Sequence, residues 1–262
     1  MTDQADHILA APPQNLLDGA SLFLDFDGTL VELADRPENV SVSDNLHQLL
    51  HDVRQMLEGR LAIVSGRSVA TLRREFGLGD FLLSGSHGLE HASPDQPVQA
   101  PPRPSEIELV LDRLSAFASG KTGLLVEEKS LGAALHFRLA PEREAECLEL
   151  CRQLARETGL YLQYGKMLFE LRPGSGGKGS AVVHLLEQTE LGTGRPVFIG
   201  DDITDEAGFI ATAQQGGSGI LVGPHRQTAA HYRLMDVTAV HVWLSQYCAQ
   251  NITGNRISEG DR

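Results

Sequence analysis

The stretch Ser21-Leu-Phe-Leu-Asp25-Phe-Asp27-Gly28-Thr29-Leu30 decides the fold. It begins as a short apolar run and ends in two aspartates and a glycine, which is typical of a buried strand that runs into a tight turn. Two more runs have this form, Leu61-Ala-Ile-Val-Ser65 before a glycine and Pro196-Val-Phe-Ile-Gly200 before an aspartate. Because each run is apolar on both faces, it fits a parallel sheet that helices cover on both sides.

Helical patterns alternate with these strands. They lie at residues 43–57, 68–76, 179–188 and 205–213. This alternation predicts an α/β fold with a Rossmann-like, doubly wound parallel sheet. Ligands bind such sheets at the carboxyl ends of the strands, so the aspartates and the serine that follow the three apolar runs should meet at one edge.

A different pattern interrupts the alternation. After five prolines within residues 94–104, the chain reads as helix, two strands, helix, two strands, at residues 107–117, 123–128, 132–139, 141–154, 160–164 and 167–172. This order predicts an inserted α+β domain at residues 103–172, with 173–177 as the return hinge. The core domain then comprises residues 1–102 and 173–262. A chain of 262 residues allows either one large domain or two modest ones.

Charge and composition restrict the function. The net charge of −13 disfavours nucleic acid and anionic membranes as partners, and an anionic substrate would need a metal ion or a local group of cations. Three cysteines form no CxxC pair or disulfide framework, which indicates a reducing compartment. Residues 1–10 lack the features of a secretory signal, and no apolar run reaches the roughly 18 residues of a membrane span. We therefore expect a cytoplasmic protein.

The first acidic pair is the strongest candidate for chemistry. Asp25, at the end of a strand, can offer one oxygen to a divalent cation such as Mg²⁺ and the other to an electrophile. Asp27 can then donate or accept a proton near a leaving group. The structural alternative is a pair of turn or cap aspartates. The whole sequence Asp-Phe-Asp-Gly-Thr-Leu after an apolar run favours a catalytic role for the two aspartates over a structural one.

A second acidic cluster, Gly200-Asp-Asp-Ile-Thr-Asp-Glu206, follows the third apolar run. Asp201 is a candidate metal ligand, and the alternative is a helix cap provided by Thr204 or Asp205. Both can hold, with Asp201 as the ligand and Thr204 as the cap. Acids this close repel one another unless a cation or protons intervene, which itself points to a metal.

Two further residues complete the candidate site. Ser65 can bond a phosphoryl oxygen and Lys178 can bring its ammonium close to Asp25, although a cap serine and a solvated lysine are the commoner roles. The glycines around Lys178 do not form a Walker A loop, because Arg172 stands at the first glycine position and Gly179 replaces the Ser or Thr.

Together these residues resemble a known superfamily. Asp25–Leu30, Ser65, Lys178 and Gly200–Glu206 are similar, in order, to the four motifs of the haloacid-dehalogenase (HAD) superfamily of aspartate-nucleophile phosphohydrolases. Within this superfamily, several shorter stretches of the chain resemble the trehalose-6-phosphate phosphatases. The resemblance covers about residues 20–225. These stretches are Ser65-Gly-Arg67, Gly85-Ser-His87-Gly88-Leu-Glu90, Glu127-Glu-Lys129, His136-Phe-Arg138 and Leu168-Phe-Glu170-Leu-Arg172-Pro173.

The resemblance implies a HAD core with an inserted cap and the hydrolysis of trehalose 6-phosphate to trehalose and phosphate, in trehalose biosynthesis. Asp25 would be the nucleophile that forms an aspartyl-phosphate, and Asp27 the general acid and base. Ser65 and Lys178 would bind the phosphoryl group. Mg²⁺ would be held by Asp25, the Asp27 carbonyl and Asp201, with Asp202 and Asp205 nearby.

The resemblance also implies a sugar site on the cap. Glu127, Lys129, Arg138 and Glu170 match residues that bind the distal glucose hydroxyls, and Arg67 and His87 would line the pocket from the core. The structural alternative is a cross-strand ion-pair cluster on a solvated face.

Rival functions are a phosphatase of another sugar phosphate, such as sucrose phosphate, and a non-catalytic sensor. The intact pair of Asp25 and Asp27 argues against a sensor. We expect a monomer with a small-molecule substrate and neither nucleic-acid nor membrane partners.

Overall fold

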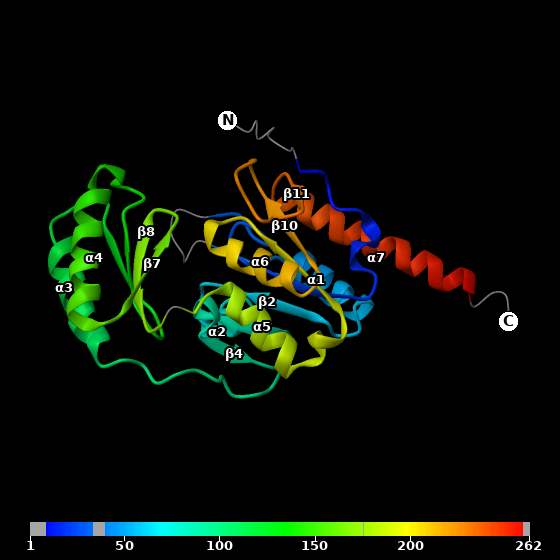
Figure 1. Ribbon diagram of the computed structural model, residues 1–262, viewed down its shortest axis with the longest axis horizontal. Helices are drawn as coiled ribbons and strands as arrows, with labels where there is room; N and C mark the ends of the chain where they lie inside the picture. Colours follow the sequence, from blue (N-terminus) through cyan, green and yellow to red (C-terminus); the bar gives the residue numbers. More distant parts are fainter. Residues whose placement is uncertain (1–8, 34–39, 175, 259–262) are drawn as a thin grey trace. The chain divides into compact units, whose positions relative to one another are not determined.

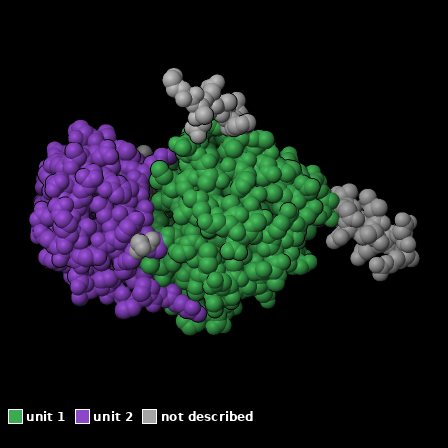
Figure 2. Space-filling view, in the orientation of Figure 1, with its two compact units in different colours: residues 1–98, 177–262 green, residues 99–176 purple. Residues whose placement is uncertain are grey.

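The computed structural model describes residues 9–33, 40–174 and 176–258 and divides into two compact units (Figures 1 and 2). Unit 1 comprises residues 1–98 and 177–262, and unit 2 comprises residues 99–176. The expected boundaries at 103 and 172 both fall inside unit 2, because the connecting segments are fastened to it. Arg103 donates to the carbonyl oxygen of Lys129, and Arg172 donates to the carbonyl oxygens of Gly174 and Gly176.

Unit 1 is built on a seven-stranded sheet in the order β11-β10-β9-β1-β2-β3-β4 (Figure 1). All neighbours are parallel except β3 and β4. The three predicted strands are β1, β2 and β9, at the centre of this sheet, which confirms the predicted parallel α/β core. The strands are β1 Ala20–Leu24, β2 Leu61–Val64, β3 Leu82–Gly85, β4 Glu90–Ala92, β9 Arg195–Gly200, β10 Ser218–Val222 and β11 Tyr232–Leu234.

Helices cover both faces of the sheet. Successive residues of β1 point to opposite sides, so Leu22 and Leu24 pack with α1, α2 and α7 while Phe23 packs with α5 and α6. The α-helices are α1 Asp44–Met56, α2 Val69–Arg74, α5 Lys178–Gln188, α6 Glu206–Gln214 and α7 Val237–Ser258. The 3₁₀ turns are η1 Gln14–Leu17, η3 Ser86–Gly88, η5 Glu190–Thr193 and η6 Ile203–Asp205.

Unit 2 is a four-stranded antiparallel sheet in the order β5-β6-β8-β7, and its chain order matches the predicted one. Two helices bury one face of the sheet, where Leu114 and Leu154 pack with Leu135 and Phe169. The opposite face carries polar side chains. The elements are α3 Glu106–Ala118, β5 Leu125–Glu128, β6 Ala133–His136, η4 Pro141–Arg143, α4 Glu144–Thr158, β7 Tyr161–Gly165 and β8 Leu168–Arg172.

Two further observations bear on the predicted setting of the protein. Among the described residues, no helix combines the length and apolar character needed to cross a bilayer. Cys147, Cys151 and Cys248 are free and buried. Burial raises the pKa of the Cys151 thiol to about 12, so this thiol stays protonated and acts as a small apolar side chain.

Candidate active site

The ends of β1 and β9 place two acids at the same edge of the sheet. Leu24 pairs with Ile199, and the N–H of Asp25 donates to the Ile199 carbonyl oxygen at 2.9 Å. Asp25 and Asp201 therefore follow adjacent, registered strands. Asp25 is buried, which is unusual for a carboxylate without a partner.

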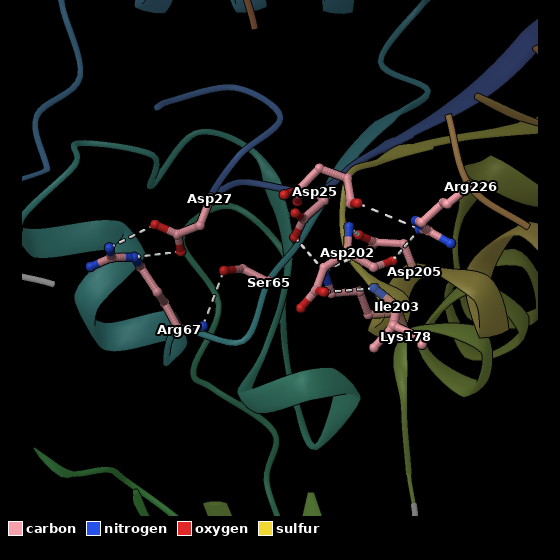
Figure 3. A network of polar contacts seen from close by, with 10 residues as sticks. Asp25, Asp27, Ser65, Arg67, Lys178, Asp202, Ile203, Asp205 and Arg226 are labelled. Atoms are coloured by element: carbon pink, nitrogen blue, oxygen red, sulfur yellow. Dashed lines mark hydrogen bonds and ion pairs between the residues drawn. The ribbon is translucent and has the colours of Figure 1, made fainter. Parts of the chain in front are cut away.

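The partner of Asp25 is Lys178, the first residue of α5 (Figure 3). Its Nζ lies 2.5 Å from Oδ1 of Asp25 and 2.6 Å from Oδ1 of Asp205. No side chain in this trio is more than 4% exposed. Lys178 is therefore a buried bridge between the two acidic clusters and not a solvated surface charge.

Negative charge exceeds positive charge at this point. Oxygens of Asp25, Asp201 and Asp205 all lie within 4.8 Å of one another. Burial, and then the charge of Asp205, raise the pKa of Asp25 well above its ordinary value in spite of Lys178. Burial alone would lower the pKa of Lys178, but the two carboxylates raise it. Three carboxylates around one ammonium leave a surplus of negative charge, which a divalent cation bound by the carboxylate oxygens would neutralise. The residues therefore fit a metal such as Mg²⁺.

Gly28 makes room for this cluster. Its φ of +83° is a conformation that other residues rarely adopt, and a Cβ atom there would overlap the carboxylate of Asp201. The turn after β1 thus needs glycine for two reasons, backbone conformation and the close approach of a candidate ligand.

Asp202 takes the capping role at the start of η6. Its carboxylate accepts from the N–H of Ile203 at 2.7 Å, and its own N–H donates to Oδ2 of Asp205 at 2.9 Å. The side chain that caps this turn is therefore that of Asp202. Of the two caps expected from the sequence, Asp205 lies at the N-cap position of α6 but its side chain makes no cap hydrogen bond there, and Thr204 lies inside η6. Because Oδ2 of Asp205 accepts the bond from the N–H of Asp202, Oδ1 is left to accept from Lys178. Asp205 therefore connects the cap to the buried cluster.

Asp27 lies beside the cluster and faces Arg67. The guanidinium donates from Nε and Nη2 to the two carboxylate oxygens at 2.8 and 2.7 Å, and Figure 3 shows the side chain turned toward Arg67. The backbone N–H of Arg67 donates to Oγ of Ser65 at 3.0 Å. One residue thus orients both Asp27 and the buried Ser65.

His87 packs against the segment that follows β2. Its N–H donates to the carbonyl oxygen of Ser65 at 3.0 Å, and a Cβ atom on Gly66 would lie 2.7 Å from the His87 ring. Both Ser86 and His87 have positive φ values, of 48° and 54°. Such conformations cost free energy and are often found at functional sites.

The candidate sugar-binding residues share the polar face of the unit 2 sheet. Register places Glu127, Ala134 and Glu170 side by side, with the small alanine between the two acids. Lys129 Nζ lies 2.6 Å from Glu170, and Glu127 lies 2.7 Å from Nε2 of His136. Burial would raise the pKa of Glu127, but the hydrogen bond from His136 and the charge of Lys129 lower it. Arg138 lies just beyond the end of β6.

These cross-strand pairs are the contacts that the structural alternative also predicts. Polar groups gathered beside a small residue can equally accept and donate to a hydroxyl-rich ligand.

Sequence reasoning missed two groups of residues around the site. Arg226 and Glu206 form an ion pair next to the Asp201–Asp202 backbone, and no spacing in the sequence relates Arg226 to the motifs. His136 stood within one of the matched stretches but had no assigned role. The alternation of Ala134 and His136 along the strand was the available sequence signal, because it places both side chains on the same face.

Comparisons with known proteins give a consistent result. A family model described as trehalose-phosphatase matches residues 23–238. The chain is 37% identical over 210 residues to a probable trehalose-phosphate phosphatase of Sinorhizobium fredii, which covers 79% of each chain. It is 33% identical over 224 residues to the trehalose-6-phosphate phosphatase of Escherichia coli, covering 85% of this chain and 84% of the relative.

Solved structures are similar as well. A crystal structure of a trehalose-6-phosphate phosphatase related protein superimposes with a TM-score of 0.74 at 27% identity, over 89% of this chain and 99% of the other. Haloacid dehalogenase-like hydrolases share the fold at lower identity. The chain thus has the HAD core with an inserted second domain.

Proposed function

The chain belongs to the trehalose-phosphatase family, and on that premise we propose that it hydrolyses trehalose 6-phosphate to trehalose and phosphate in trehalose biosynthesis. The observation that carries this proposal is the buried contact of Lys178 with Asp25, beside Asp201 and Asp205. A structural protein would gain nothing from burying two acids around one lysine beside a third acid, because such charges are costly to desolvate.

In the first step, Asp25 acts as the nucleophile. Lys178 binds Oδ1, so the other carboxylate oxygen is the one that attacks phosphorus. A P–O bond to Asp25 forms while the bond from phosphorus to the sugar oxygen breaks, which gives an aspartyl-phosphate. Asp27 protonates the departing sugar oxygen, and for this its carboxyl group has to turn away from Arg67.

In the second step, water attacks the phosphorus of the aspartyl-phosphate. Asp27, now ionised, accepts the proton, phosphate leaves, and the carboxylate of Asp25 is restored. Ser65 and Lys178 bind the transferring phosphoryl group in both steps. Phosphoryl transfer depends mainly on positioning and on charge stabilisation, which a buried ammonium and a fixed hydroxyl supply.

We propose Mg²⁺ as the cofactor, held by Asp25, the backbone carbonyl of Asp27 and Asp201, with Asp202 and Asp205 nearby. The buried surplus of carboxylate charge supports this assignment. When bound, the cation neutralises charge on the phosphoryl oxygens.

Substrate choice is assigned to unit 2. We propose that Glu127, Lys129, Arg138 and Glu170 bind the hydroxyls of the distal glucose, and that Arg67 and His87 contribute from unit 1. Phosphatase activity on a different sugar phosphate, such as sucrose phosphate, is the second candidate, because both would use the same catalytic residues.

The decisive experiment is a phosphate-release assay across trehalose 6-phosphate, sucrose 6-phosphate and 4-nitrophenyl phosphate, in EDTA and in added Mg²⁺. We expect trehalose 6-phosphate to be preferred and EDTA to abolish turnover reversibly. Asp25→Asn should lower turnover by at least about 10³-fold. Acid quench of the wild-type enzyme during turnover should trap phosphate on Asp25, and the absence of a trapped adduct would rule out the covalent route.

The setting of the protein completes the proposal. We propose a monomeric enzyme of the cytoplasm whose partner is its small-molecule substrate. The free cysteines support a reducing compartment. Gel filtration with light scattering tests the monomeric state.

A further inference from the structure

Arg226 reaches the backbone that carries Asp201. It lies in the loop between β10 and β11, and its Nη2 donates to the carbonyl oxygen of Asp202 at 2.9 Å and to that of Asp201 at 3.4 Å. Figure 3 shows the guanidinium beside the Asp202–Asp205 turn. No role in the proposed chemistry has been given to this arginine.

Glu206, in the first turn of α6, holds the guanidinium and its loop. It forms an ion pair with Arg226. It also accepts from Oγ1 of Thr228 at 2.8 Å and from the N–H of Ala229 at 2.7 Å. The glutamate thus contacts three residues of the loop, and the arginine is fixed in place although it is only partly buried.

The turn that bears Asp201 is therefore held by two sets of contacts, and a glycine leaves room for its side chain. Arg226 binds its carbonyl oxygens, Asp205 accepts the N–H of Asp202, and Gly28 leaves space for the Asp201 carboxylate. The peptide group between Asp201 and Asp202 is held at both its carbonyl oxygen and its N–H, and Gly200, the residue before Asp201, is paired with Leu221 in the sheet. The backbone is therefore held on both sides of Asp201, and this fixes the direction in which its side chain leaves the backbone.

We propose that Arg226, anchored by Glu206, is a positioning residue for the divalent-cation site. It acts through the carbonyl oxygens of Asp201 and Asp202 and not by contact with the cation or the substrate. The positive charge of Arg226 alone would repel a nearby cation, but its ion pair with Glu206 is neutral overall. Groups that orient metal ligands in this way typically change metal affinity by about 10- to 100-fold when removed.

The inference rests on the proposed metal site and is tested by binding, without turnover. Mg²⁺ is titrated into metal-free enzyme by calorimetry, and Mn²⁺ binding is followed by electron paramagnetic resonance. We expect Arg226→Met to weaken both cations about 10- to 100-fold and Glu206→Gln to weaken them about 3- to 10-fold. The circular dichroism spectrum in EDTA should match that of the wild type.

Arg233→Met is the matched control. Arg233 follows in the same region and donates from Nε to the carbonyl oxygen of Gly223 at 2.6 Å, and not to that of Asp201 or Asp202. This variant loses the same kind of contact and should keep wild-type cation affinity. If Arg226→Met does not fold, Glu206→Gln and Arg226→Lys carry the test, because both leave the loop a partial anchor.

Several results would overturn the proposal. They are unchanged or tighter cation binding in the Arg226 variants, or an equal loss in Arg233→Met. Asp201→Asn separates this failure from that of the metal site itself. If Asp201→Asn abolishes binding while the Arg226 variants keep it, only the positioning role is wrong. If Asp201→Asn also binds normally, the assigned metal site is wrong as well.

Discussion

At the scale of the residue, Lys178 is a buried cation that contacts two buried carboxylates. Its Nζ lies 2.5 Å from Oδ1 of Asp25 and 2.6 Å from Oδ1 of Asp205, and all three side chains are buried. Attraction across a low-dielectric interior is strong, but it must offset the loss of hydration of every charge in the group. Removing one partner is therefore costlier than the net contribution of the pairs suggests.

Lys178→Met tests this expectation. Without the ammonium, two buried carboxylates lose their partner, and we expect the free energy of unfolding to fall by about 3–5 kcal/mol. Urea denaturation at pH 7 in EDTA measures the change. Lys166→Met, at an exposed position of unit 2, should stay close to the wild type. A fall of similar size in both variants would contradict the special role of Lys178.

Gly28→Ala should damage both stability and cation binding. The positive φ of Gly28 makes alanine strained by about 1–3 kcal/mol, and the new methyl group displaces the Asp201 carboxylate. We expect about tenfold weaker Mg²⁺ binding by calorimetry. Gly216→Ala is the control, because its φ of +74° gives the same strain with nothing within 4 Å. Equal cation affinity in both variants would show that crowding of Asp201 does not matter.

The residues of the candidate site could be predicted where a sequence motif had both a typical spacing and a reactive or charged side chain. Asp25, Asp201 and Lys178 were candidates from the sequence, and the structure brings them together. Arg226 was not, since its contact joins loops through a backbone carbonyl that any residue type could supply. The capping role of Asp202 was likewise ambiguous, because neighbouring acids and Thr204 have similar cap propensities.

At the scale of the element, the edge strand β4 meets α5 through two histidines. The rings of His91 and His184 stack with centroids 4.0 Å apart. Burial, and then the charge of His184, lower the pKa of His91 from its ordinary value of 6.5 to about 4. The unfolded chain takes up a proton on His91 near pH 6.5, whereas the folded protein takes it up near pH 4, so acidification through this window lowers stability.

His91→Phe keeps the stacked ring and removes the titration. Between pH 7 and pH 4.5, we expect the wild type to lose about 1–2 kcal/mol more unfolding free energy than the variant, less than the full pKa shift implies because His91 is only partly buried. Urea denaturation at both pH values in EDTA measures the difference. Parallel losses in the two proteins would show that His91 does not contribute to acid sensitivity.

In unit 1, strands with a continuous apolar run were predictable from the sequence, and shorter or mixed strands were not. The strands β1, β2 and β9 are central and buried on both faces, so their sequences carry a strong signal. The outer strands β3 and β10 include serine and glycine, and the edge strands β4 and β11 have three residues each. Such segments pair because a neighbour is present, which local sequence does not record.

At the scale of the whole molecule, chemistry and substrate choice are assigned to different units. The proposed sugar-binding residues share one face of the unit 2 sheet, while α3 and α4 cover the other. A change on the polar face should alter recognition of the sugar and leave the phosphoryl chemistry of unit 1 intact.

Glu127→Ala and Glu170→Ala test this division. We expect kcat/KM for trehalose 6-phosphate to fall about 10- to 100-fold, the usual cost of a lost charged hydrogen bond, with less than about threefold change for 4-nitrophenyl phosphate. Glu128→Ala is the matched control, because Glu128 adjoins Glu127 on β5 but pairs with Arg103. Equal losses on both substrates would mean that unit 2 does not read the sugar.

The two-unit organisation was predictable from the change of pattern at the proline-rich stretch. Its limits were not, because they depend on side chains that reach back along the chain. Arg103 and Arg172 hold the connecting segments by carbonyl contacts, and no composition shift marks those contacts.

The alternation of β1 has a consequence for how this protein can change. Leu22 and Leu24 face one layer of helices and Phe23 faces the other, and the residue after Leu24 is Asp25, the proposed nucleophile. Inserting or deleting a single residue in this strand would turn every side chain to the wrong layer and would also move that carboxylate off the lysine. The same few residues of β1 thus set both the packing of the core and the position of Asp25. Changes in chain length therefore have to accumulate in the connecting loops.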